Sequence, residues 1–190
     1  GSNVPVQVSG LTGVRAVAGG GDHSLALKND STVWAWGSNS LGELGNGANT
    51  KSDVPIQVSA LTGIISLVSG SYHSLALKND GTLWSWGDNL FGQLGNGSYI
   101  SSNVPVQVSG LTGIMDVATG GDHSFALKND GTIWSWGKNS NGQLGNGTNV
   151  KSNVPVQVSG LTGITAMAGG ALHSLALKND GTVWSWGHNY

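Results

Sequence analysis

Hydrophobic and polar residues alternate along short segments of this chain with the two-residue period of β-strands. The segment HSLALK places Leu25 and Leu27 on one face, and the segment TVWAW places Trp34 and Trp36 together on one face. The chain also holds 32 glycines, which indicate many tight turns and few helices. The predicted strands of one unit are Val14–Ala18, His23–Lys28 and Thr32–Trp36, with a fourth of the kind seen at Val4–Val8.

The same pattern returns every 50 residues, which indicates internal repeats. Asn-Asp-Gly after the second segment predicts a hairpin turn, because glycine adopts a positive φ without steric penalty. Ser31 takes the glycine position in the first unit, at a cost of about 1 kcal/mol if the turn is kept. Proline in VPVQV removes a ladder donor, so this strand belongs at a sheet edge. The repeated segments start at Val4, Val54, Val104 and Val154 (VPVQVS or a variant) and at His23, His73, His123 and His173 (HSLALKND or a variant).

Four antiparallel strands per repeat, with a proline-containing strand outermost and small residues in the first strand, predict an all-β fold made of β-propeller blades. The predicted blades cover residues 14–58, 64–108, 114–158 and 164–186, the last completed by strand 4–8 of the same or a partner chain. Burying one tryptophan removes about 150–250 Å² from water, so the repeated pair is expected to pack between blades. The predicted packing residues are Trp34, Trp36, Trp84, Trp86, Trp134, Trp136, Trp184 and Trp186.

The string GxxHSLALKNDGTxWSWGxNxxGQLGNG resembles the repeat of the regulator of chromosome condensation (RCC1) family and covers essentially the whole chain in four copies. The glycine before the histidine, the WG pair and the GQLG tail occur together at the expected separations. The resemblance implies a propeller fold, usually of seven blades. It does not imply one function, because similar proteins include a GTPase exchange factor, a photoreceptor and an inhibitor of β-lactamases. The exchange factor's inserted wedge and the photoreceptor's arginine cluster have no counterpart in this sequence, whose single arginine is Arg15.

The two ends of the chain have complementary deficits. The chain opens with an outermost strand and its last repeat ends after a third strand, so Val4–Val8 could complete the sheet of residues 164–186. Blades shaped for a seven-membered ring would have to tilt strongly to close at four, whereas two chains arranged head to tail give eight blades with a smaller change at each interface. We therefore expect a homodimer that forms an eight-bladed ring with strand exchange at the termini.

Charge and composition exclude several partners. The net charge is −2, from eight basic and ten acidic residues, and no basic patch remains that could neutralise several phosphates, so we expect no nucleic-acid partner. No apolar run is long enough to cross a membrane, and the absence of cysteine excludes disulfides and thiolate catalysis. These features assign no cellular compartment.

Two groups of residues carry the chemistry of possible active or metal sites. Asp22-His23-Ser24 contains the residue types of a hydrolase triad, but adjacent strand residues point to opposite faces, and Tyr72 and Leu172 replace the acid in other copies. The repeated histidines converge near one end of the central channel, yet no further ligand lies at metal-binding spacing within a unit. We predict no catalytic residue, no metal site, no cofactor and no enzymatic activity.

The candidate binding surface is the rim where the copies differ. The turns KNDG and SGLTG lie on one rim and are nearly constant, whereas the other two loops of each unit vary. Loops on a rigid scaffold often carry binding sites, although neutral drift of exposed loops is the alternative. Three aromatic residues fall in one unit and are the predicted anchors. The candidate rim residues are Tyr72, Phe91, Tyr99, Asp88, Lys138, Leu172 and His188.

The sequence therefore predicts a non-enzymatic scaffold or protein-interaction module that assembles with itself and holds a possible protein partner on its variable rim. Near-identical units, matched ends and an opening Gly1-Ser2 that resembles a cloning remnant favour an engineered protein or fragment. The alternative is a carbohydrate-binding or cell-surface module in which Tyr72, Phe91 and Tyr99 stack on sugar rings.

Overall fold

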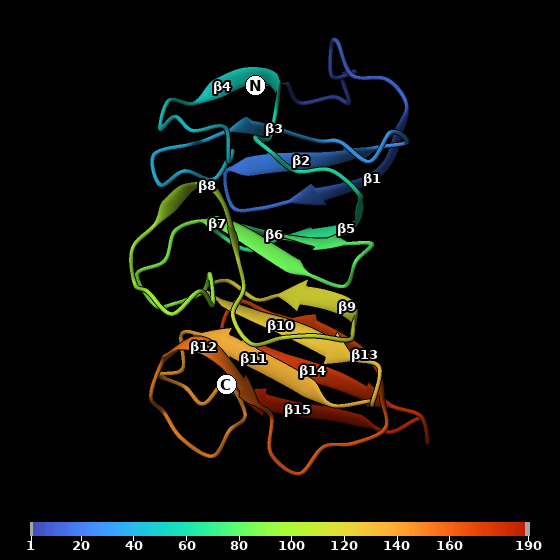
Figure 1. Cartoon of the computed structure of the whole chain (residues 1–190), viewed down its shortest axis with the longest axis vertical. Helices are drawn as coiled ribbons and strands as arrows, with labels where there is room; N and C mark the ends of the chain where they lie inside the picture. Colours follow the sequence, from blue (N-terminus) through green and yellow to red (C-terminus); the bar gives the residue numbers. More distant parts are fainter. Residues whose placement is uncertain (1, 189–190) are drawn as a thin grey trace.

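The computed structural model describes residues 2–188, and all regular secondary structure in this range is β-strand. The strands form four antiparallel sheets in chain order, which succeed one another from one end of the molecule to the other (Figure 1). We call them blades one to four. No helix among the described residues is long and apolar enough to cross a membrane.

The elements of each blade follow the repeat. Blade one contains β1 (Val14–Gly19), β2 (His23–Lys28), β3 (Val33–Gly37) and β4 (Ser52–Gln57), and blade two contains β5 (Ile64–Ser69), β6 (His73–Lys78), β7 (Leu83–Gly87) and β8 (Ser102–Gln107). Blade three contains β9 (Ile114–Thr119), β10 (His123–Lys128), β11 (Ile133–Gly137) and β12 (Ser152–Gln157). Blade four contains β13 (Ile164–Gly169), β14 (His173–Lys178) and β15 (Val183–Gly187).

The predicted order of strands within a blade is confirmed. The first strand of each blade contacts the first strand of the next, so it lies innermost, and the proline-containing strand lies at the outer edge. The second strand has the predicted bounds, whereas the fourth begins two residues earlier, at Ser52 rather than Val54. Ser52 Oγ accepts a hydrogen bond from Val54 N and donates one to Val54 O, which gives the strand a local start that hydrophobic alternation does not reveal.

The turn between the second and third strands forms as predicted. In blade two, Thr82 donates both its backbone N–H and its hydroxyl to Asp80 Oδ1, at 2.9 and 2.6 Å, and its hydroxyl accepts from Trp84 Nε1. Gly81 adopts φ +80° within this turn. Ser31 adopts φ +64° at the equivalent place in blade one, so the first unit keeps the turn with a strained residue.

The core lies between blades rather than within one sheet. The interface of blades one and two buries Leu25, Leu27 and Val33 of blade one against Ile64, Leu67 and Trp86 of blade two, with Val58 and Leu61 of the connecting segment between them. Trp86 and Trp136 are fully buried, while Trp84 and Trp134 pack at the margin of the same clusters. Each interface therefore has three parts. They are the face of one blade that is turned toward the next blade (its outward face), the connecting segment, and the face of the next blade that is turned back toward it (its inward face).

The glycine of the GQLG tail permits close contact with the buried tryptophan of the next blade. A Cβ on Gly95, which has φ +65°, would lie 2.7 Å from Trp136 Nε1. That indole nitrogen donates to Gln93 O at 2.9 Å, and Trp86 and Trp186 donate to Glu43 O and Gln143 O in the same way. The tail thus contacts the neighbouring blade through close packing of its glycine and through hydrogen bonds to its carbonyl oxygen.

The ring predicted from the repeats is open in the single chain. Residues 4–8 form no strand and are exposed beside blade one, at the end of the molecule opposite blade four (Figure 1). Blade four accordingly has three strands, and the outer edge of β15 has no neighbour among the described residues. Completion of blade four by its own chain does not occur here, and completion by a partner chain stays a prediction.

Replacing Ser31 by glycine should stabilise the protein. A left-handed conformation costs an L-residue about 1–2 kcal/mol, and the greater freedom of glycine in the unfolded chain offsets about 0.4–1 kcal/mol of this. Urea denaturation of S31G should therefore show an unfolding free energy about 0.5–1 kcal/mol higher. Ala60, at φ +53° where other units have glycine, should respond to A60G in the same direction.

Gly81→Ser is the matched control for this prediction. A Cβ at Gly81 meets no atom within 4 Å, so G81S tests conformational strain without a steric clash. It should lower the unfolding free energy by a similar amount. An S31G variant that is less stable than the original chain would contradict the argument.

Candidate functional site

The candidate rim is formed by the loops that follow the first and third strands of each blade. In blade two these are residues 70–72, between β5 and β6, and residues 88–101, between β7 and β8. The two loops meet through a hydrogen bond from Asp88 N to Tyr72 O of 2.8 Å. In an antiparallel sheet both connections lie at the same end, so the two variable loops of each complete blade lie side by side.

A buried asparagine fixes the long loop. Asn89 donates through Nδ2 to Ser98 O and Ile100 O, at 3.0 and 3.1 Å, and accepts from Leu94 N through Oδ1. Asn39 and Asn139 make the equivalent bonds in blades one and three. In the sequence this residue is the asparagine that recurs two positions after the WG pair. The alternation of hydrophobic and polar residues does not indicate its role.

Asp88 is part of the loop framework rather than an open binding group. Its carboxylate accepts from Gln93 Nε2 at 2.9 Å, from Leu90 N at 3.1 Å and from Ser101 Oγ at 3.3 Å. The side chain is buried. Asp88 therefore stabilises the conformation of the long loop that carries two other candidate rim residues, Phe91 and Tyr99.

Phe91, Tyr99 and Lys138 come together at the junction of blades two and three. Lys138 Nζ lies 4.7 Å from the centre of the Phe91 ring and forms an ion pair with Asp122 at 3.0 Å. Lys151, which the sequence analysis did not select, lies with Nζ 4.3 Å from the Tyr99 ring centre and 5.9 Å from that of Phe91. We call Phe91, Tyr99, Lys138 and Lys151 the aromatic–lysine cluster.

The remaining candidates lie elsewhere on the rim. Tyr72 is exposed on the shorter loop of blade two. Leu172 and His188 belong to blade four, where Leu172 O accepts from His188 N at 2.9 Å. The structure thus brings together Phe91, Tyr99 and Lys138, whereas Tyr72, Leu172 and His188 are distributed over blades two and four.

The histidines form hydrogen bonds between blades, not within a unit. His23 Nε2 lies 2.9 Å from Ser74 Oγ, and His73 Nε2 lies 2.9 Å from Ser124 Oγ. The serine hydroxyl donates to a carbonyl of the preceding tail, Glu43 O or Gln93 O, so its oxygen accepts from the imidazole N–H. This network assigns the Nε2-protonated neutral tautomer, with Nδ1 buried and unpartnered.

Burial keeps these histidines neutral. It lowers the pKa of His73 to about 3, with smaller contributions from His123 and His23, and lowers the pKa of His23 and His123 to about 4. Asp122 beside His123 and Asp22 beside His23 oppose the shift without reversing it. The imidazoles therefore act as uncharged interblade donors.

The described residues hold no group of three or more His, Cys, Asp or Glu side chains placed to bind a metal ion. His23 bonds through its ring to Ser74 of the next blade rather than to the adjacent Ser24. The end of the channel beside them is lined by the glycine-rich loops, and Gly21 N and Ser71 N donate to Ser71 O and Gly121 O of the following blades. This end is built from backbone rather than from reactive side chains.

Repeated antiparallel blades, joined by indole and imidazole hydrogen bonds, define a β-propeller repeat protein whose two variable loops in each complete blade lie on one rim. The chain belongs to the RCC1-like domain family, whose model matches residues 1–190. A comparison with curated proteins finds no match.

Solved structures of this family are close in shape. Human WBSCR16 is 29% identical, with a TM-score of 0.87 over 99% of this chain and 51% of its own. Yeast RCC1 (Prp20) bound to Kap60 is 26% identical, with a TM-score of 0.83 over 95% of this chain and 45% of its own. Prp20p from Saccharomyces cerevisiae, described with its binding to Gsp1p and histones, is 26% identical, with a TM-score of 0.83 over 96% and 48%. The chain spans about half the length of these structures.

Acid should destabilise the fold well above the range in which carboxylates titrate. A histidine with a lowered folded pKa contributes stability above its unfolded pKa of 6.5, and this contribution is lost as the pH falls toward the folded value. Urea denaturation at pH 7 and pH 5 should show a loss of about 2 kcal/mol for each neutral buried histidine.

The choice of pH range separates this effect from that of the turn aspartates. Hydrogen bonds from Thr82 and Thr182 lower the pKa of Asp80 and Asp180 to about 2, so these groups remain charged throughout the interval from pH 7 to 5. An unfolding free energy that stays constant between pH 7 and 5 would contradict the interblade role of the histidines.

Proposed function

We propose that this chain is a non-enzymatic protein-interaction module that completes its propeller with a second copy, to give an eight-bladed ring. The observation that carries the proposal is the complementarity of the two open ends. Each end presents one half of an interface that the chain itself forms three times between its own blades.

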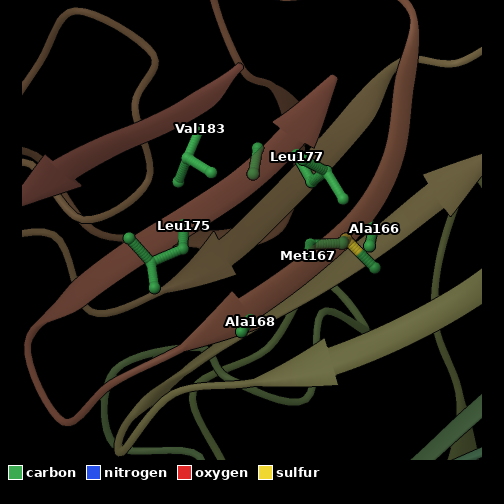
Figure 2. A pocket seen from close by; sticks show the side chains of 7 residues that line it. Ala166, Met167, Ala168, Leu175, Leu177 and Val183 are labelled. Carbon is green, nitrogen blue, oxygen red and sulfur yellow. The ribbon is translucent and has the colours of Figure 1, made fainter. Parts of the chain in front are cut away.

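Blade four presents an uncovered outward face. Figure 2 shows Leu175, Leu177 and Val183 on this face, together with the small residues of β13. Val183 is 68% exposed, whereas the equivalent Val33 and Ile133 are 1% and 0% exposed because a following blade covers them. An apolar surface of this kind is typical of an interaction site.

Blade one presents the matching inward face. Val17 is 73% exposed, whereas Leu67 and Val117 at the same position of blades two and three are 7% and 4% exposed. Trp36 is half-buried, although Trp86 and Trp136 are fully buried at the same position. The inward face of one copy therefore supplies the side chains that the outward face of another lacks.

The N-terminal segment supplies the two missing parts of the same interface. Residues 2–7 lie one repeat period before β4 and have nearly the same sequence, so they correspond to the strand that blade four lacks. In blade one, β4 pairs with β3 through Trp34 and Gln57, Ala35 and Ile56, and Gly37 and Ser52. Val8 and Leu11 correspond to Val58 and Leu61, the linker residues buried between blades one and two. A second copy can thus place residues 2–7 on the free edge of β15 and bury Val8 and Leu11 behind it.

The relatives support both halves of the proposal. Two copies of this chain have about the length of human WBSCR16, of which one copy covers 51%. Yeast Prp20 is described as bound to Kap60 and as binding Gsp1p and histones, which supports protein recognition by an RCC1-like propeller. The near identity of the four units further supports an engineered origin.

Sedimentation equilibrium of the chain should give twice the mass of one copy. Val183→Asp should raise the dimer dissociation constant by about 100-fold or more, because it would bury an unpaired carboxylate. Val183 is exposed in the isolated chain, so V183D should leave the far-ultraviolet circular dichroism of the monomer unchanged.

Val150→Asp is the matched control, since Val150 is equally exposed but lies on the rim rather than on an open face. V150D should dimerise like the original chain, and deletion of residues 2–8 should weaken the dimer. A monomer at all concentrations, or assemblies larger than two copies, would contradict the closed eight-bladed ring.

A further inference from the structure

We propose that the aromatic–lysine cluster between blades two and three is a docking site for an acidic peptide segment, with Lys151 as the residue that receives its carboxylate. The cluster lies within one chain, so this proposal does not depend on ring closure. Its partner is inferred from charge, exposure and the surrounding apolar side chains.

Lys151 is the lysine whose charge has no carboxylate partner in the described part of the chain. Every other lysine has an aspartate oxygen within 4.0 Å. Lys51, at the equivalent position of blade one, pairs with Asp53 at 3.5 Å, but blade three has Asn153 at that place. The substitution of a single neighbour leaves one ammonium group uncompensated.

The ammonium group of Lys151 is held in place. Nζ donates to Leu90 O at 3.1 Å and lies over the Tyr99 ring, so the side chain bridges from blade three to the long loop of blade two. A cation fixed in this way loses little side-chain entropy when it binds an anion. The nearby carboxylates do not compete, because Asp88 is hydrogen-bonded within its loop and Asp122 pairs with Lys138.

The residues around this charge are apolar and exposed. Leu90 and Ile100 are 62% and 78% exposed, and both belong to the same loop as Phe91 and Tyr99. At the positions of Leu90 and Phe91, blade one has serine and leucine and blade three has serine and asparagine. The four apolar residues therefore occur together in blade two alone. A fixed positive charge among exposed apolar side chains matches a carboxylate flanked by apolar residues.

A peptide fits this surface better than a sugar. Carbohydrate stacking needs open aromatic faces, but Lys151 covers one face of Tyr99 and Lys138 covers one face of Phe91. Leu90 and Ile100 provide contact area for apolar side chains and no hydrogen bonds for hydroxyl groups. The surface therefore favours Asp or Glu next to a large apolar residue.

Selection from a phage-displayed library of twelve-residue peptides on the whole chain tests the proposal. The enriched peptides should carry Asp or Glu beside an aliphatic or aromatic residue, and their affinity should fall with added salt. Fluorescence polarisation with a selected peptide should show about fivefold weaker binding to K151Q, the effect expected from the loss of one exposed charge pair.

K51Q is the matched control, because it removes from blade one the equivalent lysine, which contacts no aromatic ring among residues 2–188. It should bind the peptide like the original chain, and V183D should also bind it, which separates this result from ring assembly. The proposal is overturned if selection enriches no acidic peptide, if K51Q weakens binding as much as K151Q, or if acidic oligosaccharides on a glycan array bind in its place.

Discussion

Each blade of this protein has two apolar faces, and another blade of the same shape is what covers them. Blade one turns Leu25, Leu27 and Val33 toward blade two, and blade two turns Ile64, Leu67 and Trp86 toward blade one. The buried cluster therefore lies between two blades, and no blade has a core of its own. Stability therefore comes from neighbours, as in other repeat proteins. The exposed Val17 and Val183 at the two ends are the direct result of this arrangement.

Polar bonds give the apolar contacts their register. An indole N–H reaches a tail carbonyl of the preceding blade, and an imidazole N–H reaches a serine hydroxyl of the following one. These groups lie on opposite sides of the same blade, so a rotation of one sheet against the next would leave buried donors without partners. The apolar clusters supply most of the stabilisation, and these bonds select one geometry.

The sequence predicted the fold in detail because the blade is local and repeats. Strand period, the Asn-Asp-Gly turn and the edge proline each act within a few residues, and the 50-residue spacing shows that they act together four times. The predicted start of the fourth strand was two residues late, since Ser52 starts β4 through its own side-chain hydrogen bonds. Residues 4–8 show the limit, because their alternating pattern predicts a strand but they form none in this chain.

The candidate site was predictable only in part. Phe91, Tyr99 and Lys138 were selected because the copies differ there, but the position of Lys151 opposite Leu90 depends on contact between residues 61 apart in the chain. The absence of an acidic residue at Asn153 was visible in the sequence and is the signal that would have identified Lys151. The sequence did not indicate that Asp88 is bonded within its loop, because its partners, Gln93 and Ser101, are brought to it by the loop conformation.

The asparagine that holds each long loop has a consequence for how such rims diversify. Asn89 secures the loop through backbone groups at residues 94, 98 and 100, and none of these bonds depends on the side chains presented to solvent. Surface residues can therefore be exchanged while the loop conformation is inherited. In a repeat of this design, the residues that contact a partner can evolve, or be grafted, without a change in the scaffold that supports them.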